Sequence, residues 1–361
     1  MGLADKITEI ETEISKTQKN KATEAHLGLL KAKIARLKNE ADAQRTKGGG
    51  SSGGFDVKKA GSATVVLIGL PSTGKSSLLN AMTGAKARTA AHAFTTTTCI
   101  PGMMDYKGAQ IQILDLPGII AGAEHGRGRG REVIAVARTA DLVLFVLDVF
   151  DPLYLPKLRD TIEAVGVRLD CAPPKIVIEK RAKGGLAIHY DVKPTHLSDK
   201  VVSAVLKEYG IFNASVVVHE DATVDQLVDV VVGGRVYASS LVVVNKIDLV
   251  KPEFLKKLPF GFLPVSAEKR TNVESLKESI FRKLNLIRVY TRSRFEAADK
   301  NAPLIVKNGT TVLEAAEKLH RDLRKSFKHA RVWGPSAKHP GQRVGANHVL
   351  KDGDEFIAET R

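Results

Sequence analysis

The chain has little cysteine, few aromatic residues and no long apolar segment. Its 361 residues include only two cysteines, Cys99 and Cys171, and one tryptophan. Two cysteines without the spacing of metal ligands argue against a disulfide-stabilised scaffold and favour a reducing compartment. No apolar run reaches the roughly 20 residues that cross a bilayer, and the N-terminus shows no signal-peptide pattern. We therefore expect no membrane association and a cytoplasmic protein.

Acidic residues are outnumbered by basic ones, which gives a net charge of +15. Such a charge fits plain solubility, and it also fits a phosphate-rich partner such as RNA. Charge and domain pattern together favour contact with RNA or the ribosome. The length predicts two or three domains with ample core.

A glycine-rich loop joins an apolar run at 63–68, typical of a buried strand, to a helical pattern that begins at 77–82. In this context a G-x-x-x-x-G-K-[ST] match indicates phosphate binding, because backbone N–H groups and the helix N-terminus point at the anion. Lys75 is expected to hold the β- and γ-phosphates, and the Ser76 hydroxyl to bind Mg²⁺. The alternative is a strand–helix turn that binds nothing. The candidate residues are Gly69, Leu70, Pro71, Ser72, Thr73, Gly74, Lys75, Ser76 and Ser77.

Three further segments fit a nucleotide switch. The threonine-rich stretch 92–98 can supply a second hydroxyl to Mg²⁺, or it can form an edge strand. The strand predicted at 110–114 leads into an acid that can hold the metal shell and a glycine whose N–H can meet the γ-phosphate. The glycine-rich basic stretch 121–131 has the composition of a second switch. The residues after the strand are Asp115, Leu116, Pro117, Gly118 and Ile119.

A candidate base-reading segment follows the apolar strand predicted at 241–244. The carboxylate of Asp248 can accept two hydrogen bonds from guanine, whereas adenine offers neither donor, so the wrong base can be rejected by about 10⁴-fold. The stem of Lys246 can lie over the base plane, and Asn245 can tie neighbouring loops together. A later backbone segment can meet the guanine O6. The full set is Asn245, Lys246, Ile247, Asp248, Ser266 and Ala267.

The sequence predicts four parts. Residues 1–47 have helical spacing with a break near Asn20, which predicts a helical hairpin arm for packing or for partner binding. Residues 48–59 have the composition of a flexible linker. The nucleotide domain is predicted at 60–286 and contains an α+β insert at 172–237. A small basic domain is predicted at 287–361.

Within the insert, residues 175–179 and 186–190 predict a β-hairpin, followed by a helix from Ser198 to Tyr209 and a strand at 215–218. In the last domain, a short strand is expected directly after Asn308-Gly309.

The boxes GLPSTGKS, FTTTT, DLPG, NKID and SAE occur in the order expected of a GTPase. Residues 115–133 and 331–356 resemble the developmentally regulated GTP-binding (DRG) family, which is related to the Obg group. The resemblance covers nearly the whole chain. It implies an α/β P-loop GTPase with a mostly parallel, doubly wound sheet and a C-terminal TGS domain of β-grasp type. It also implies an insert like a ribosomal-protein domain, ribosome association, a role in translation and a small stabilising partner protein. The character of the chain suggests an archaeal source.

The resemblance also implies site roles. Residues 69–76 would bind the phosphates of GTP or GDP, with Ser76 and Thr96 as Mg²⁺ ligands. Lys75, Thr96 and Gly118 would act in hydrolysis. Asp115 would meet the metal shell, and residues 245–248 would read the base.

One departure from Ras-like enzymes bears on the rate. Ile119 and Ile120 stand where those enzymes carry a water-orienting Gln, and an apolar side chain cannot orient water. We therefore expect slow intrinsic hydrolysis that needs help. That help could come from a ribosomal surface, from K⁺, or from Arg127 or Arg131. Potassium-dependent relatives have Asn where this chain has Ser72, and the two arginines could equally be solvated loop charges.

Three functions follow as hypotheses. The leading one is a GTP-hydrolysing, ribosome-linked switch. The second is a nucleotide-gated RNA-binding module in which hydrolysis is incidental. The third, an ATPase, is disfavoured by the intact box at 245–248.

Overall fold

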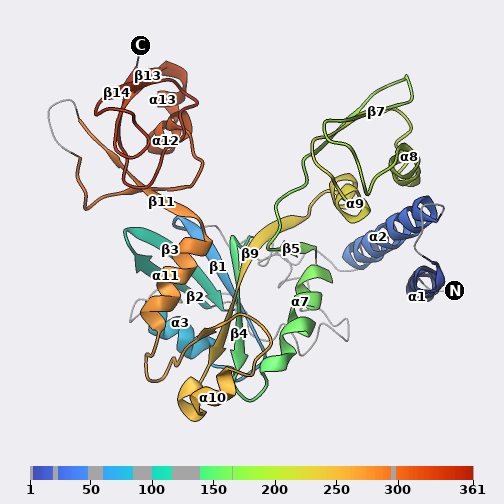
Figure 1. Ribbon diagram of the computed structural model, residues 1–361, viewed down its shortest axis with the longest axis horizontal. Helices are drawn as coiled ribbons and strands as arrows, with labels where there is room; N and C mark the ends of the chain where they lie inside the picture. Colours follow the sequence, from blue (N-terminus) through green and yellow to red (C-terminus); the bar gives the residue numbers. More distant parts are fainter. Residues whose placement is uncertain are drawn as a thin grey trace. The chain divides into compact units, whose positions relative to one another are not determined.

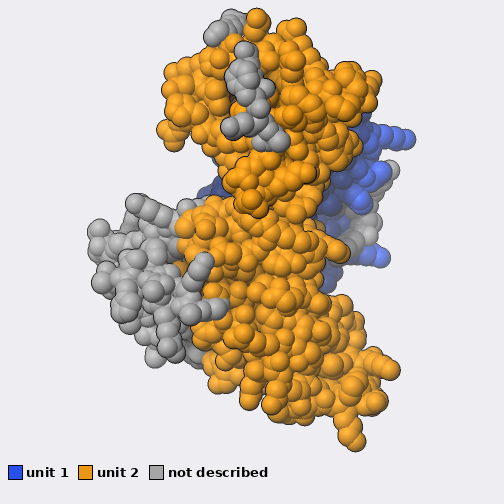
Figure 2. All heavy atoms as spheres, turned by 90° about the vertical axis from the view of Figure 1, so that its left-hand side faces the viewer, with its two compact units in different colours: residues 1–54, 171–237 blue, residues 55–170, 238–361 orange. Residues whose placement is uncertain are grey.

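The computed structural model describes residues 3–18, 23–47, 60–83, 100–115, 139–164, 166–293 and 298–360. Within them, two compact units are present: one combines residues 1–54 with 171–237, and the other combines 55–170 with 238–361 (Figure 2). No helix of the described residues has the length and apolarity of a membrane span.

A seven-stranded sheet forms the centre of the second unit (Figure 1), in the order β10-β9-β4-β1-β3-β2, with β5 also paired to β9. β1, β3, β4, β9 and β10 run parallel, and β2 is an antiparallel edge strand. Continuous apolar runs form these strands because both sheet faces are covered. The bounds are β1 Ala63–Ile68, β2 Ile100–Tyr106, β3 Ala109–Asp115, β4 Leu142–Asp148, β5 Val167–Leu169, β9 Val236–Asn245 and β10 Leu263–Pro264.

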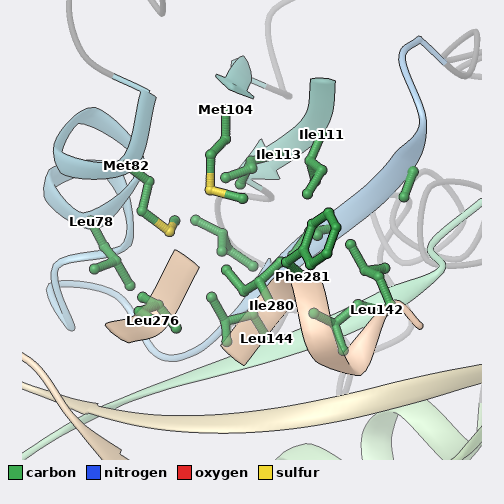
Figure 3. Close-up of a cluster of buried hydrophobic side chains, with 14 of the residues drawn as sticks. Leu78, Met82, Met104, Ile111, Ile113, Leu142, Leu144, Leu276, Ile280 and Phe281 are labelled. Atoms are coloured by element: carbon green, nitrogen blue, oxygen red, sulfur yellow. The ribbon is translucent and has the colours of Figure 1, made fainter. Parts of the chain in front are cut away.

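Helices cover the two faces of this sheet. α3 (Lys75–Thr83) and α11 (Val273–Lys283) bury Leu78, Leu276 and neighbouring side chains against one face (Figure 3). α7 (Leu155–Ala164) buries Leu158 and Ile162 against the other. The expected mostly parallel, doubly wound sheet is thus confirmed. Short helical segments complete this part, namely η3 Pro152–Tyr154, η4 Ile247–Leu249 and α10 Pro252–Leu255.

The C-terminal part is a mixed five-stranded sheet in the order β12-β11-β15-β13-β14. β11 and β15 pair in parallel, and the other pairs are antiparallel. α12 packs its buried face into the core of this sheet, as in a β-grasp fold. The bounds are β11 Leu286–Thr291, β12 Leu304–Lys307, α12 Val312–Leu319, α13 Arg321–Ser326, β13 Phe327–Trp333, β14 Gln342–Val344 and β15 Glu355–Thr360.

The prediction of a short strand after Asn308-Gly309 is wrong. Thr311 instead begins α12: its hydroxyl accepts a hydrogen bond from the Glu314 N–H at 3.4 Å, while the Glu314 carboxylate accepts one from the Thr311 N–H at 2.8 Å. This reciprocal cap satisfies donors that a helix start leaves open, so the chain turns directly from β12 into the helix.

The first unit contains a three-stranded sheet in the order β6-β8-β7. β8 lies between β6 and β7, so the expected hairpin of residues 175–179 and 186–190 is wrong. β8 buries three of its five residues, whereas β6 buries one and β7 none, so the more apolar strand takes the centre. The elements are α1 Leu3–Lys16, α2 Glu24–Lys47, β6 Ile176–Lys180, β7 Leu186–Tyr190, α8 Asp199–Glu208, β8 Ala214–Val218 and α9 Val224–Val232.

α2 packs on the insert rather than standing alone. Ala32 is fully buried in the same cluster as the insert helices, and its carbonyl accepts a hydrogen bond from the Tyr209 hydroxyl at 3.1 Å. Lys31 pairs with Asp225 at 2.7 Å and Arg36 with Glu208 at 3.2 Å. Apolar burial provides the larger contribution here, since exposed ion pairs are worth little.

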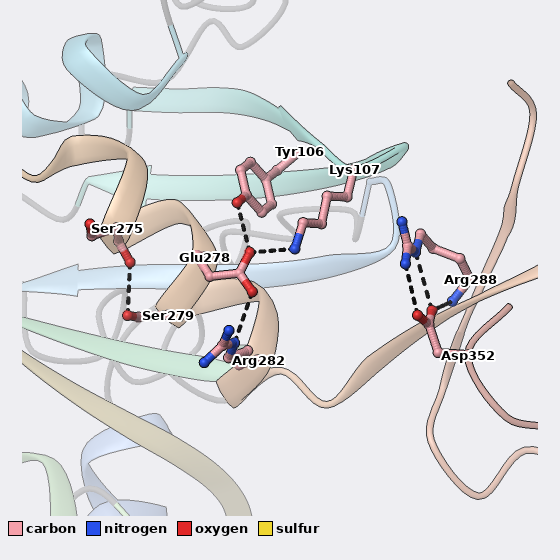
Figure 4. Close-up of polar contacts among 8 residues, drawn as sticks. All are labelled: Tyr106, Lys107, Ser275, Glu278, Ser279, Arg282, Arg288 and Asp352. Atoms are coloured by element: carbon pink, nitrogen blue, oxygen red, sulfur yellow. Dashed lines mark hydrogen bonds and ion pairs between the residues drawn. The ribbon is translucent and has the colours of Figure 1, made fainter.

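Glu278 on α11 anchors the turn between β2 and β3 (Figure 4). One oxygen accepts hydrogen bonds from the Tyr106 hydroxyl at 2.7 Å and the Lys107 amine at 2.6 Å, and the other accepts one from Arg282 at 2.8 Å. These donors lower the pKa of Glu278 to about 2, with the hydrogen bond from Lys107 as the largest cause. The carboxylate therefore stabilises the fold above its ordinary pKa of 4.5, and this contribution is lost as the pH falls toward 2.

We expect Glu278→Gln to lower the unfolding temperature by a few degrees at pH 7, because the amide cannot pair with both cations. The difference from wild type should shrink as the pH falls from 4.5 toward 2. Thermal unfolding across this pH range measures it. Glu274→Gln is the control, since Glu274 is exposed and its ion pair among the described residues is with Lys277 on the same helix. An equal loss in both variants would contradict a specific role for Glu278.

Candidate functional site

The candidate residues gather where the parallel strands of the central sheet end. β1 and β3 are aligned so that Leu67 lies opposite Asp115, and β4 and β9 so that Asp148 lies opposite Asn245. The loops after these strands therefore emerge at one edge of the sheet. In open α/β sheets this edge is where ligands bind.

The phosphate loop between β1 and α3 wraps around the amine of Lys75. This side chain is 8% exposed, and its Nζ donates to the carbonyls of Gly69 at 3.0 Å and Leu70 at 2.7 Å. The Thr73 hydroxyl donates to the same Leu70 carbonyl at 3.0 Å. Burial lowers the pKa of Lys75, because removing water disfavours the ammonium. A bound polyphosphate would supply the missing negative charge.

Two glycines are required by close backbone approach. Gly74 has φ +85°, and a Cβ there would lie 2.3 Å from the Asn245 amide nitrogen. A Cβ on Gly69 would lie 2.2 Å from the Val146 carbonyl oxygen. Neither contact is tolerable for a side chain, so the loop path depends on glycine at both positions.

Ser76 and Asp115 face each other at the base of the loop. The Ser76 hydroxyl donates to Asp115 Oδ2 at 2.6 Å, and the buried Oδ1 has no hydrogen-bond partner among the described residues. An unpartnered buried carboxylate oxygen beside a hydroxyl is an oxygen donor set that suits a hard cation such as Mg²⁺. The described residues contain no cluster of three or more His, Cys, Asp or Glu side chains that could hold a metal on their own.

Asn245 connects three segments at the end of β9. Its Nδ2 donates to the Thr73 carbonyl of the phosphate loop at 2.9 Å, and its Oδ1 accepts from the Ala267 N–H at 3.0 Å. Asn245 has only 2% of its surface exposed, so both hydrogen bonds are shielded from water. Asn245 therefore fixes the spacing between the phosphate loop and the loop that begins at Ser266.

Asp248 lies exposed in the next turn. A hydrogen bond from the Ser266 side chain is the largest cause that lowers the pKa of Asp248, which favours the ionised carboxylate. The buried Ser266 also accepts a hydrogen bond from the Lys269 N–H at 3.1 Å. Asp248 therefore offers an exposed carboxylate in the turn directly after Asn245 and Lys246.

Lys246 has a left-handed backbone with φ 65°, and its amine pairs with Asp148 Oδ2 at 2.6 Å. The sequence reasoning missed Asp148. The available signal was an acid at the end of a buried parallel strand, a position that shares its edge with the other strand ends.

The remaining candidates divide into exposed, partly buried and undescribed positions. Pro71, Ser72 and Ser77 are exposed, whereas Ile247 and Ala267 are partly buried. Seven further residues lie outside the described residues: Thr96, Leu116, Pro117, Gly118, Ile119, Arg127 and Arg131.

Three family models match the chain. Residues 64–180 match a model described as 50S ribosome-binding GTPase, residues 183–286 match the C-terminal region of that domain, and residues 287–356 match the TGS domain. Together with the P-loop and the sheet, these matches define a GTPase with a C-terminal TGS domain.

Curated relatives match over almost the full length. An uncharacterized GTP-binding protein of Methanocaldococcus jannaschii is 48% identical, covering 98% of this chain and 92% of the relative. The developmentally-regulated GTP-binding protein 1 of Xenopus laevis is 46% identical, covering 98% of each, and its Dictyostelium discoideum homolog is 45% identical. The chain belongs to the DRG family of GTP-binding proteins.

Solved structures are more distant. The Schizosaccharomyces pombe YchF GTPase is 14% identical with a TM-score of 0.46, covering 84% of this chain and 99% of that one. A GTP-binding protein from Pyrococcus horikoshii has a TM-score of 0.44 at 15% identity, covering 82% and 100%.

We expect Gly74→Ala to weaken binding of Mg²⁺-GDP by at least about tenfold, because its methyl group would collide with Asn245 and break the bond to Thr73. Calorimetry measures the affinity. Gly261→Ala is the control, since a Cβ there meets nothing within 4 Å. Wild-type affinity in the Gly74 variant would contradict the assigned loop path.

Proposed function

We propose that this GTPase grips GTP between Lys75 at the triphosphate and Asp248 at the base, and that it acts as a slow, ribosome-linked switch in the cytoplasm. The observation that carries the nucleotide site is the Asn245 bridge, which joins the phosphate loop to the loop beyond β10. Residues 69–77 would surround the phosphates, and residues 245–248 with Ser266 and Ala267 would surround guanine.

Mg²⁺ fits the donors present in this chain. The Ser76 hydroxyl and the Asp115 carboxylate would hold the Mg²⁺ ion, with Thr96 as a further proposed ligand. When bound, the ion would neutralise charge on the β- and γ-phosphates. Lys75 would bind the same phosphates, Gly118 would offer its N–H to the γ-phosphate, and Leu116, Pro117 and Ile119 would line that side.

Slow intrinsic hydrolysis follows from the isoleucines at 119 and 120. A water-orienting side chain and an arginine finger together are worth up to about 10⁵ in rate. The proposed help is a ribosomal surface, with K⁺, Arg127 and Arg131 as further candidates. We also propose that a small partner protein binds and stabilises this GTPase.

The ribosomal role is supported by the matched model's description, 50S ribosome-binding GTPase, and by charge. Residues 287–361 carry 15 Lys and Arg against 9 Asp and Glu. The alternative is a nucleotide-gated RNA-binding module in which hydrolysis is incidental, because this basic domain could bind RNA whatever the hydrolysis rate.

Asp248→Asn should transfer preference from GTP to xanthosine triphosphate, since an amide donor can pair with the second carbonyl of xanthine. Competition binding against labelled GDP measures the order of affinities. Glu253→Gln, a nearby exposed acid on α10, is the control. Retained GTP preference would remove Asp248 from the base site.

GTP turnover should be slow for the protein alone and rise at least about tenfold with purified ribosomes. Lys75→Ala should abolish turnover and make ribosome binding insensitive to nucleotide. Turnover assays, repeated with Na⁺ replaced by K⁺, and ribosome co-sedimentation measure this. Ribosome binding that ignores both nucleotide and the Lys75 substitution would favour the RNA-binding module, and equal turnover in the two salts would exclude K⁺.

A further inference from the structure

Asp148, at the end of β4, contacts the proposed base-reading segment, and the proposed nucleotide roles leave it without an assignment. The pairing of β4 with β9 places Asp148 directly opposite Asn245, and Asn245 immediately precedes Lys246 in the sequence. The Asp148 side chain is 15% exposed, and that of Lys246 is 32% exposed. The two charges meet at 2.6 Å in this partly shielded place, where an ion pair is stronger than on an open surface.

Both oxygens of this carboxylate are engaged. Oδ2 accepts from Lys246, and Oδ1 accepts from the Phe150 N–H at 3.1 Å. The second bond holds the carboxylate in place, so Asp148 is a fixed anchor for the amine rather than a mobile partner.

The backbone of Lys246 also has an unusual conformation. Its φ of 65° is a left-handed conformation that is unfavourable for a residue other than glycine. The ion pair fixes the amine at the far end of the lysine side chain, while the backbone fixes the near end. With the amine committed to Asp148, the four-carbon stem is the part of Lys246 left to face a base.

We propose that Asp148 is a positioning residue for nucleotide binding: it holds Lys246 so that the lysine stem forms an apolar wall against the purine ring. This inference rests on the proposed base site. Packing of the Lys246 stem against the ring does not depend on which hydrogen-bond donors or acceptors the base carries. Losing Asp148 should therefore lower the affinity for all purine nucleotides by a similar factor. In contrast, losing Asp248 should change the preference among bases.

The first test is calorimetry of Asp148→Asn with Mg²⁺-GDP and with Mg²⁺-IDP, whose base lacks the exocyclic amine. We expect both affinities to fall by a similar factor of about tenfold. The KM for GTP should rise while kcat at saturation stays within about twofold. Asp148→Glu keeps the charge and should recover part of the affinity. Asp160→Asn, an exposed acid on α7, should bind as wild type.

A double-mutant cycle separates positioning from a general loss of structure. In a Lys246→Met background, Asp148→Asn should change the GDP affinity by less than about twofold, because no amine remains to be held. An undiminished effect in that background, or a lowered kcat with unchanged KM, would overturn the inference. If the wild-type protein showed no preference for GDP over ADP, the proposed base site itself would fail. If the wild-type protein preferred GDP but Asp148→Asn bound GDP normally, only the role of Asp148 would fail.

Discussion

The hydrogen bond from Asn245 to the Thr73 carbonyl is the interaction on which the proposed nucleotide site depends. It crosses from β9 to the loop after β1, although β4 lies between these strands in the sheet. The same amide group holds the Ala267 N–H. A buried amide with partners on both its nitrogen and its oxygen has little freedom to rotate, so the phosphate loop and the loop that begins at Ser266 are kept at a fixed separation. Gly74 permits this, because any larger residue would occupy the space of the Asn245 amide.

Near the Asn245 bridge, two charged side chains are buried, which is unfavourable in an ordinary apolar core. Lys75 is buried with a lowered pKa, and Asp115 keeps one buried oxygen without a partner among the described residues. Each is unfavourable by itself, since buried charge is stabilised only by an opposite charge or by hydrogen bonds. Under the proposed function, a bound phosphate would pair with Lys75 and a bound cation with Asp115, and both groups would then be favourable. The apolar strands on either side provide the stability that allows such a site to exist without its ligand.

The sequence was most informative where one physical requirement acts over a continuous stretch. The strand predicted at 63–68 coincides with β1, because a strand covered on both faces must be apolar throughout. The helix predicted from Ser198 to Tyr209 is α8 with Ser198 as its cap, which is a local hydrogen bond that local sequence encodes. The order of the boxes also placed residues 69–76 and 245–248 at strand ends, where they lie in the structure. The predicted roles of Thr96 and Gly118 lie outside the described residues.

What the sequence could not predict are pairings between distant segments. The hairpin expected of β6 and β7 is wrong because β8, which follows them in the chain, is more apolar and displaces them to the edges. Neighbours in sequence favour pairing only if no better strand competes for the centre. The pair of Asp148 and Lys246 belongs to the same class, since 98 positions and the whole insert separate the two residues. Only the alignment of β4 with β9 brings them together, so residues without a motif of their own can still shape the site.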